Sequence, residues 1–280
     1  MHTLKPLGHF SAYLLDLDGV VYRGEQLLPG ARELVEWIDS TGRQVAFVSN
    51  NSFATVEEVT EKLARLGTPH PEGRVITAGW ATIQVIAQRF PAGRVFPLTG
   101  PSVVEMVRAG GLTPTWLEAE DGPTPDAVLI GLDRTLTYER LARALDASLA
   151  GAALFAVNRD PRLPVEDGFE PGTGSVTAAL EFASGQQAEI IGKPAPALVF
   201  EAMRQLDVDA AHTLMVGDGL DLDVVAGHRA GVDTALVLTG LTTPEQARAA
   251  TGERQPTTIY DGLPALLDAL RRADGGEPGA

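Results

Sequence analysis

Short apolar runs alternate with amphipathic segments along the first quarter of the chain, and several of these runs end abruptly in polar residues. The pattern predicts a strand that begins at residue 13 and ends at the carboxylates of Asp16 and Asp18, before Gly19, and further strands at 43–48 and 74–77. Helices are expected between them at 31–40 and 55–67. Glycine and proline fall near the ends of the helical segments, where helices usually start or stop. Strand, helix, strand, helix, strand is the order typical of a parallel sheet with helices packed on it.

The last third of the chain returns to the same order. Strands are expected at 188–192, 213–218 and 235–238, and helices at 195–206, 222–230 and 262–272. The residues between the two parts have elements of their own, with helices at 80–89 and 138–149 and strands at 127–131 and 153–157. The expected fold class is α/β, with a Rossmann-like parallel sheet core, helices on both of its faces, and an inserted α/β domain.

The same patterns predict where the domains begin and end. The core domain is expected over 1–77 and 187–270, interrupted by an inserted domain at 78–186. Residues 271–280 are predicted to form a disordered tail, because this end of the chain is polar and contains glycine and proline. A chain of 280 residues buries roughly three quarters of its unfolded surface, so its core needs no covalent cross-link.

Composition narrows the classes of function. The chain has no cysteine, which excludes disulfides, thiolate metal sites and cysteine nucleophiles and fits a reducing cytoplasm. Its 22 basic and 37 acidic residues give a net charge of −15, and such a surface repels a nucleic-acid backbone. The N-terminus has no apolar stretch typical of a signal peptide, and no run approaches the ~18 apolar residues of a membrane span. We therefore expect a cytoplasmic protein that acts on neither a nucleic-acid polymer nor a membrane.

The first apolar run ends in Asp16-Leu17-Asp18-Gly19. Alternate residues of an extended chain share a face, so the two carboxylates are expected to project to the same side. Two carboxylates so close cannot both stay ionised cheaply unless a cation or a shared proton relieves their repulsion. An ordinary acidic turn after a strand explains the same residues, so the pair alone does not decide between a turn and a metal site.

Four expected strands end in chemically useful groups. These are Asp16 with Asp18, Ser49 with Asn50, Lys193 directly after a strand, and Asp218. Ligands of open parallel sheets gather at the carboxyl ends of the strands, so the four groups are expected to meet in one site. Each group taken alone is explained by turn or capping chemistry, but that explanation is much less probable for all four in this order.

Four segments also resemble, in order, the motifs of the haloacid dehalogenase superfamily: Asp16-Leu17-Asp18-Gly19-Val20-Val21, Ser49-Asn50-Asn51, Lys193-Pro194, and Gly217-Asp218 with Asp223. Within the insert, the segment from Gly131-Leu132-Asp133 through Tyr138 and the segment Pro171-Gly172-Thr173-Gly174 are similar to parts of the large C2-type cap of this superfamily. The resemblance covers roughly residues 10 to 240 and points to subclass IIA, the nitrophenylphosphatase and ribonucleotide-monophosphatase type.

The resemblance implies a Mg²⁺-dependent phosphatase acting on a small-molecule phosphate monoester. It implies that Asp16 is the nucleophile that becomes an aspartyl-phosphate, and that Asp18 is the general acid and base. It assigns Mg²⁺ to Asp16, Asp218 and the main-chain carbonyl of Asp18. The remaining assignments are phosphate binding by Ser49, Asn50, Asn51 and Lys193, and support of the metal site or of Lys193 by Asp223 and, less directly, Asp221.

Other functions that the same fold can carry stay open at this point. Hydrolysis of a carbon–halogen bond needs neither Mg²⁺ nor an acid at the second position, so Asp18 and Asp218 argue against it. A phosphotransferase or phosphomutase shares the first half-reaction, and a catalytically silent binding protein would be expected to have lost one of the motif residues. Caps of this type can dimerise, so a homodimer through the insert is a candidate. Neither the physiological ester nor the cap residues that select it can be read from the sequence.

Overall fold

The structure is a computed structural model that describes residues 7–115, 123–165 and 168–275, without the side chains of residues 164 and 165. The chain folds into two compact units. The first unit contains Met1–Ser49, Glu57–Ile76 and Lys193–Ala280, and the second contains Asn50–Val56 and Thr77–Gly192. The expected insert at 78–186 lies inside the second unit. Residues 1–6 of the expected core and 276–280 of the expected tail lie outside the described residues.

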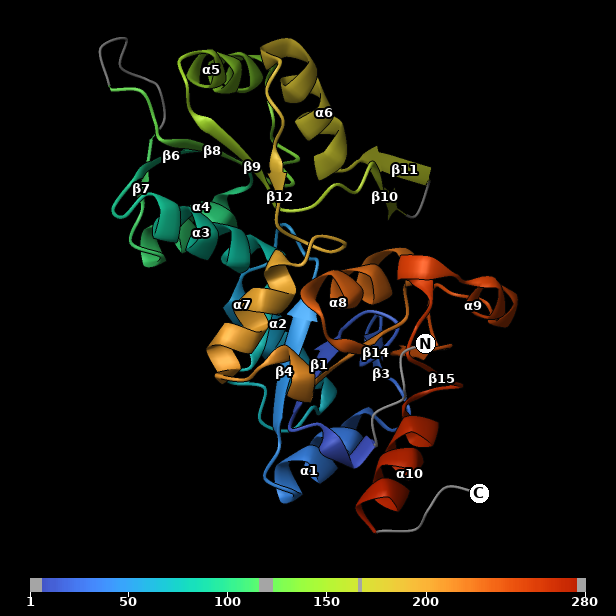
Figure 1. Ribbon diagram of the computed structural model, residues 1–280. Coiled ribbons are helices and arrows are strands. Elements are labelled where there is room, and N and C mark those ends of the chain that lie inside the picture. The colour runs from blue at the N-terminus through green and yellow to red at the C-terminus, as the bar shows by residue number, and fades with distance from the viewer. Residues whose placement is uncertain (1–6, 116–122, 166–167, 276–280) are drawn as a thin grey trace. The chain divides into compact units, whose positions relative to one another are not determined.

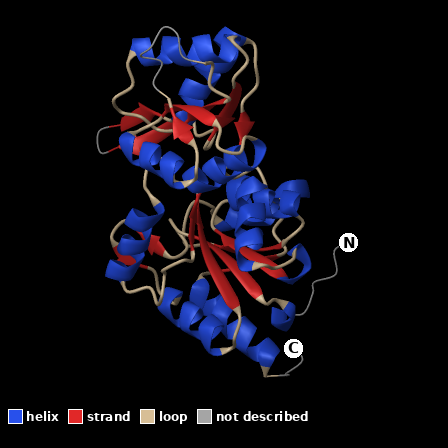
Figure 2. Ribbon diagram, turned by 90° about the vertical axis from the view of Figure 1, so that its left-hand side faces the viewer, coloured by secondary structure: helices blue, strands red, loops and turns tan. Residues whose placement is uncertain are grey.

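The first unit is built on a six-stranded sheet with the order β15-β14-β13-β1-β4-β5 (Figures 1 and 2). Its strands are β1 (Ala12–Asp16), β4 (Gln44–Ser49), β5 (Val75–Thr77), β13 (Thr213–Gly217), β14 (Asp233–Val237) and β15 (Thr258–Tyr260). β1 pairs in parallel with both β13 and β4 and lies in the middle of the sheet. Ala12 to Leu15 of β1 are fully buried, as expected for a central parallel strand that is covered on both faces.

Helices of the first unit pack on both faces of this sheet. On one face α7 (Ala197–Leu206) contacts α8 (Val225–Ala230), and on the other α1 (Ala31–Ser40) contacts α10 (Leu263–Asp274). The remaining elements are α2 (Val56–Leu66), α9 (Pro244–Ala249), the hairpin of β2 (Tyr22–Arg23) and β3 (Gln26–Leu27), the π-helical turn η3 (Leu220–Val224), and the 3₁₀ turns η1 (Leu7–His9), η2 (Ala210–His212) and η4 (Gly252–Arg254).

The second unit has its own five-stranded sheet with the order β12-β9-β8-β6-β7. The strands are β6 (Arg94–Leu98), β7 (Thr113–Pro114), β8 (Ala127–Ile130), β9 (Ala153–Ala156) and β12 (Glu189–Ile190), and their pairs are parallel. α3 (Ala78–Arg89) and α4 (Pro101–Ala109) contact each other, as do α5 (Tyr138–Leu149) and α6 (Thr173–Ser184) (Figure 1). A separate hairpin joins β10 (Arg162–Val165) to β11 (Gly168–Pro171). The α/β fold class expected from the sequence is confirmed, with parallel sheets and packed helices in both units.

Two expected elements differ from the structure. The strand expected over 188–192 was assigned to the core sheet, but β12 pairs with β9 in the sheet of the second unit, with Ile190 opposite Ala156. The first strand ends at Asp16, where the apolar run was expected to stop, and the amides of Val20, Val21 and Tyr22 all donate to the Leu17 carbonyl and close the expected turn.

The tail expected to start at residue 271 is the second difference, because α10 continues to Asp274. The helix buries Leu263, Leu266, Leu267 and Leu270, the spacing of one helical face. Asp274 then pairs with Arg43 at 2.6 Å, which fixes the last turn to the start of β4. No helix in the described part of the chain combines the length and apolar character needed to cross a bilayer.

Candidate active site

Polar groups collect where the central strands of the first unit end. β1 ends in Asp16, β4 ends in Ser49, and Asp218 follows the last residue of β13. The chain leaves β1 toward β4 on one side and returns through β13 on the other, so the strand order reverses around β1. Such a reversal point is where open α/β sheets bind their ligands, at the carboxyl ends of the strands.

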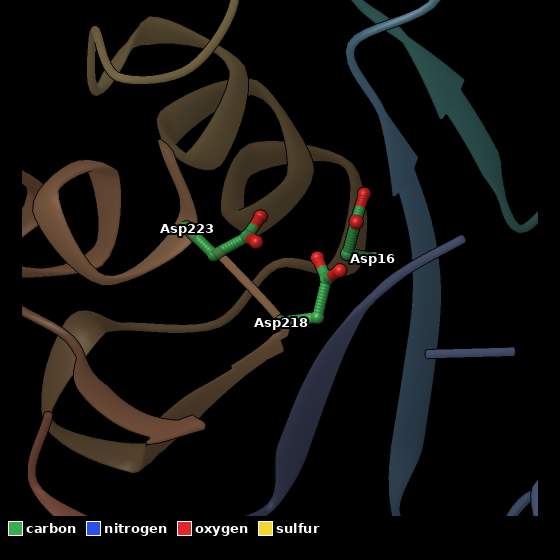
Figure 3. A group of neighbouring side chains, drawn as sticks. All are labelled: Asp16, Asp218 and Asp223. Carbon is green, nitrogen blue, oxygen red and sulfur yellow. The ribbon is translucent and has the colours of Figure 1, made fainter. Parts of the chain in front are cut away.

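Three of the carboxylates converge at this edge (Figure 3). Asp16, Asp218 and Asp223 each present an oxygen, and these oxygens lie within 4.8 Å of one another. Asp223 reaches the group from the π-helical turn, where its amide donates to the carbonyl of Gly219. A Cβ atom on Gly217 would overlap the side chain of Asp223, so the close approach depends on the missing side chain at that position.

Lys193 joins two of these carboxylates. Its Nζ lies 2.6 Å from Oδ1 of Asp16 and 2.6 Å from Oδ1 of Asp223, and only 2% of the side chain is exposed. Burial by itself would lower the pKa of this ammonium group, but the charges and hydrogen bonds of Asp16 and Asp223 outweigh it and raise the pKa. Lys193 is therefore a permanent cation beside Asp16.

The group still carries excess negative charge. Three ionised carboxylates and one ammonium leave a charge of −2, and the cost of that charge appears in the pKa values. Burial raises the pKa of Asp16 well above its ordinary range despite Lys193, and burial together with the Asp223 charge raises that of Asp218 to about 6. Carboxylate oxygens in a dianionic cluster fit a hard divalent cation such as Mg²⁺, so these residues can hold the metal that the sequence implied.

The carboxylate of Asp218 has a fixed orientation. Its Oδ2 accepts a 2.7 Å hydrogen bond from the amide of Leu241, and the hydroxyl of Thr242 donates to its main-chain carbonyl at 2.6 Å. A Cβ atom on either Gly19 or Gly240 would overlap this carboxylate, and Gly19 also has a φ of +82°. Two glycines therefore form the wall against which the carboxylate packs.

Asp18 comes from the turn after β1 rather than from the strand itself. Among the described residues, the carboxylates that lie close enough together to hold a metal ion are those of Asp16, Asp218 and Asp223. The side chain of Asp18 is not part of this group. Burial raises the pKa of Asp18, while the Lys62 charge and a hydrogen bond from the Tyr22 hydroxyl work in the opposite direction. A carboxyl group of this kind is suited to exchange a proton rather than only to bind a cation.

The residues expected to bind phosphate lie in different surroundings. Ser49 is 7% exposed at the end of β4. The carbonyl of Asn50 accepts a 2.9 Å hydrogen bond from the side-chain amide of Asn158. Oδ1 of Asn51 accepts from the amides of Phe53 and Ala54, so this side chain shapes its own turn. Asp221, which the resemblance placed less directly at the site, has an exposed side chain that pairs with Arg254 at 2.8 Å.

Sequence reasoning did not single out Tyr22, Lys62, Gly240, Leu241 or Thr242. Gly240, Leu241 and Thr242 lie together in the segment that follows strand β14, at the carboxyl end of that strand. The run Thr239-Gly240-Leu241-Thr242 could have been found by the same strand-end argument that found Asp218. The contacts of Tyr22 and Lys62 follow from the turn geometry, which no spacing in the sequence encodes.

Family comparisons agree with this fold and site. Residues 13–113 match the model of the haloacid dehalogenase-like hydrolases, and residues 190–266 match a second model of HAD-hydrolase-like proteins. An acid sugar phosphatase of Staphylococcus saprophyticus is 35% identical over 264 residues, which cover 94% of this chain and 99% of that protein. The chain belongs to the haloacid dehalogenase-like hydrolase family.

Solved structures of the same family resemble the whole chain. A 4-nitrophenylphosphatase from Thermotoga maritima has a TM-score of 0.85 and 33% identity, covering 95% of this chain and 99% of its own. A glycerol phosphate phosphatase from Mycobacterium tuberculosis, solved in complex with magnesium, has a TM-score of 0.82 and 36% identity, covering 94% of this chain and 78% of its own. The resemblance to subclass IIA phosphatases expected from the sequence is confirmed.

Proposed function

We propose that this protein is a Mg²⁺-dependent phosphatase that hydrolyses a small-molecule phosphate monoester through an aspartyl-phosphate on Asp16. The observation that carries the proposal is the position of Lys193, whose ammonium lies 2.6 Å from both Asp16 and Asp223. A buried cation at this position orients the nucleophilic carboxylate. Together with a bound Mg²⁺ it would offset the charge of the three carboxylates, so that a strongly anionic protein could attract phosphate at this site. The phosphatase names of its relatives support the same activity.

Mg²⁺ would be held by the side chains of Asp16 and Asp218 and by the main-chain carbonyl of Asp18. The magnesium complex of the M. tuberculosis relative and the −2 charge of the carboxylate cluster support this assignment. Bound there, the ion would neutralise phosphoryl oxygens and lower the pKa of the carboxyls that hold it. Asp223 bonds to Lys193 and to the amide of Gly219 at 2.9 Å, so we assign it the support of Lys193.

The first half-reaction uses two carboxyl groups. The free oxygen of the Asp16 carboxylate attacks phosphorus, the bond from phosphorus to the ester oxygen breaks, and Asp18 donates its proton to the leaving oxygen. Lys193 holds the other oxygen of Asp16, and its charge favours the ionised form of the attacking carboxylate. In the second half-reaction Asp18, now a base, takes a proton from water as that water attacks phosphorus, and Asp16 is released.

Phosphate binding is assigned to Ser49, Asn50 and Lys193. The Ser49 hydroxyl and the main-chain amide of Asn50 follow a strand end, where such groups commonly bind phosphoryl oxygens. For Asn51 the main-chain amide is the better candidate, because its side-chain oxygen is already engaged in a turn.

We further propose that the second unit is the C2-type cap and that the protein forms a homodimer through it. Support comes from two aromatic side chains on helices that contact each other, Tyr138 of α5 with 88% exposure and Phe182 of α6 with 93% exposure. A cytoplasmic location and the absence of a nucleic-acid partner stay predictions that rest on composition.

Phosphate release across a panel of esters tests the proposal. The panel would include p-nitrophenyl phosphate, sugar phosphates, glycerol phosphate and nucleoside monophosphates, each with Mg²⁺ and with chelator. We expect Mg²⁺-dependent release that is lost in Asp16→Asn, while the melting temperature of that variant stays within a few degrees of the parent. Substantial release by Asp16→Asn would refute the nucleophile assignment. Transfer of phosphate to an added alcohol without net release would instead indicate a phosphotransferase.

A further inference from the structure

Thr239 lies in the segment that follows β14 and bonds to both ends of the chain segment 19–23, which forms the turn after β1. Its hydroxyl donates to the carbonyl of Gly19 at 2.6 Å, and its own carbonyl accepts a hydrogen bond from the guanidinium of Arg23. The fold alone brings these residues together, because Gly19 and Thr239 are 220 positions apart in the sequence. Thr239 therefore holds the turn from outside it.

The two peptide groups on either side of Gly19 are each fixed by one hydrogen bond. The amide of Gly19 donates to the carbonyl of Tyr22 at 2.8 Å, and this amide shares a planar peptide group with the carbonyl of Asp18. Thr239 fixes the next peptide group through the carbonyl of Gly19. Glycine restricts its own backbone less than any other residue, and Gly19 has a φ of +82°. The direction of the Asp18 carbonyl therefore depends on both bonds.

The same segment fixes the carboxylate of Asp218. The amide of Leu241, two residues after Thr239, donates to Oδ2 of Asp218 at 2.7 Å. A Cβ atom on Gly19 would overlap this carboxylate and lie 3.1 Å from the Cα atom of Gly240, so the turn, the carboxylate and the segment after β14 pack closely together. Residues 239–241 thus hold the turn that carries Asp18 with one bond and Asp218 with another.

We propose that Thr239 is a positioning residue that sets the spacing between two ligands of the metal, the carbonyl of Asp18 and the carboxylate of Asp218. The inference rests on the proposed function, in which both groups bind Mg²⁺, and adds the residue that relates them. Mg²⁺ demands near-ideal octahedral geometry, whereas Ca²⁺ tolerates a range of ligand numbers and distances. A change in the spacing of the two ligands should therefore weaken Mg²⁺ binding more than Ca²⁺ binding.

Thr239→Val removes the hydroxyl and keeps the size and branching of the side chain. Calorimetric titration of the metal-free protein with Mg²⁺ and with Ca²⁺ measures the effect. Loss of a group that orients a metal ligand typically costs about 10–100-fold in metal affinity. We expect the Mg²⁺ affinity to fall about 10-fold and the Ca²⁺ affinity to fall by a clearly smaller factor. Thr239→Ser keeps the hydroxyl and should keep both affinities close to those of the parent.

Two further variants separate positioning from a general effect on the fold. Thr213→Val is the matched control, because the Thr213 hydroxyl also donates to a main-chain carbonyl, that of Asp209 at 2.7 Å, but at the start of β13. Urea unfolding of the metal-free protein should show a similar loss of stability in both valine variants, but Thr213→Val should leave both metal affinities unchanged. Arg23→Met removes the bond to the Thr239 carbonyl and should lower the ratio of Mg²⁺ to Ca²⁺ affinity by a smaller factor than Thr239→Val.

The outcomes distinguish this inference from the proposed function. An unchanged Mg²⁺ affinity in Thr239→Val, or a fall of equal size for Mg²⁺ and Ca²⁺, would overturn the positioning role and leave the metal assignment intact. If Thr239→Val does not fold, Arg23→Met decides, because its side chain is exposed, and a ratio of affinities equal to that of the parent would overturn the role. A parent protein that binds neither ion would refute the proposed metal site, and the inference would fail with it.

Discussion

Gly240 lies so close to Asp218 that a Cβ atom at residue 240 would overlap the Oδ2 atom of the aspartate. The same oxygen accepts the 2.7 Å hydrogen bond from the amide of Leu241. Gly240 therefore leaves the space that the Asp218 carboxylate needs, and the amide of Leu241 fixes the direction of that carboxylate. Because main-chain atoms bound this space, any side chain at residue 240 would force the Asp218 carboxylate to rotate away from Asp16.

Gly240→Ala is therefore expected to displace the Asp218 carboxylate. We expect Mg²⁺ affinity to fall at least 10-fold and turnover to fall by a similar or larger factor, measured by calorimetric titration and by phosphate release. Gly275→Ala is the control, because a Cβ there makes only ordinary contacts of 3.5 Å or more. Mg²⁺ affinity equal in the two variants would show that Asp218 does not depend on this glycine or does not bind the metal.

Lys193→Met is expected to lower both stability and activity. The substitution removes the ammonium but keeps a similar volume, and it leaves Asp16 and Asp223 without the bonds of 2.6 Å that now offset their charges. Removal of one member of a buried ion pair costs on the order of 3–5 kcal/mol, so urea unfolding should show a loss of several kcal/mol.

A second substitution tests the origin of that loss. In Lys193→Met/Asp223→Asn one buried charge is removed together with its partner, so part of the lost stability should return. Activity should not return, because Asp16 still lacks its cation. A double variant less stable than the sum of the two single effects would contradict the charge argument, and unchanged kinetics of Lys193→Met would exclude Lys193 from the site.

Much of this architecture could be predicted from the sequence because its apolar pattern is unambiguous. The expected helices at 31–40 and 138–149 match α1 and α5 residue for residue. The strand ends at Asp16 and Ser49 were found because a fully apolar run stops there abruptly. These features depend on the local spacing of apolar residues, which can be read directly from the sequence.

What could not be predicted depends on contacts between distant segments. The run at 188–192 is apolar enough for either sheet, and only its pairing with β9 places β12 in the second unit. Lys193 therefore reaches Asp16 from the loop that follows β12 and not from a strand of the central sheet. The glycine wall around Asp218 joins residues 19 and 240, which are brought together by the fold alone.

The proposed homodimer predicts a specific change in mass. Light scattering of the purified protein should give about twice the chain mass of 29.5 kDa. Tyr138→Ser/Phe182→Glu replaces the two most exposed aromatic side chains among the described residues of the second unit with polar ones and should give a single chain mass. Substitution of exposed Ile259 on β15 of the first unit is the control and should leave the mass unchanged. A parent protein of 29.5 kDa would exclude the dimer.

Mg²⁺ binding should depend on pH in a direction set by the raised carboxyl pKa values. Burial raises the pKa of Asp218 from 3.8 to about 6, so the metal-free fold has a stability contribution below pH 3.8 that is lost as the pH rises through about 6. Mg²⁺ must displace any proton on Asp218, and the apparent affinity for Mg²⁺ should rise up to ~10-fold per pH unit below pH 6.

Melting temperatures at pH 5.0 and 7.5, with Mg²⁺ and with chelator, measure this pH dependence of Mg²⁺ binding. The gain from Mg²⁺ should be small at pH 5.0 and larger at pH 7.5, and it should disappear at both in Asp218→Asn. An equal gain at both pH values would contradict binding to carboxyls that are protonated at pH 5.0.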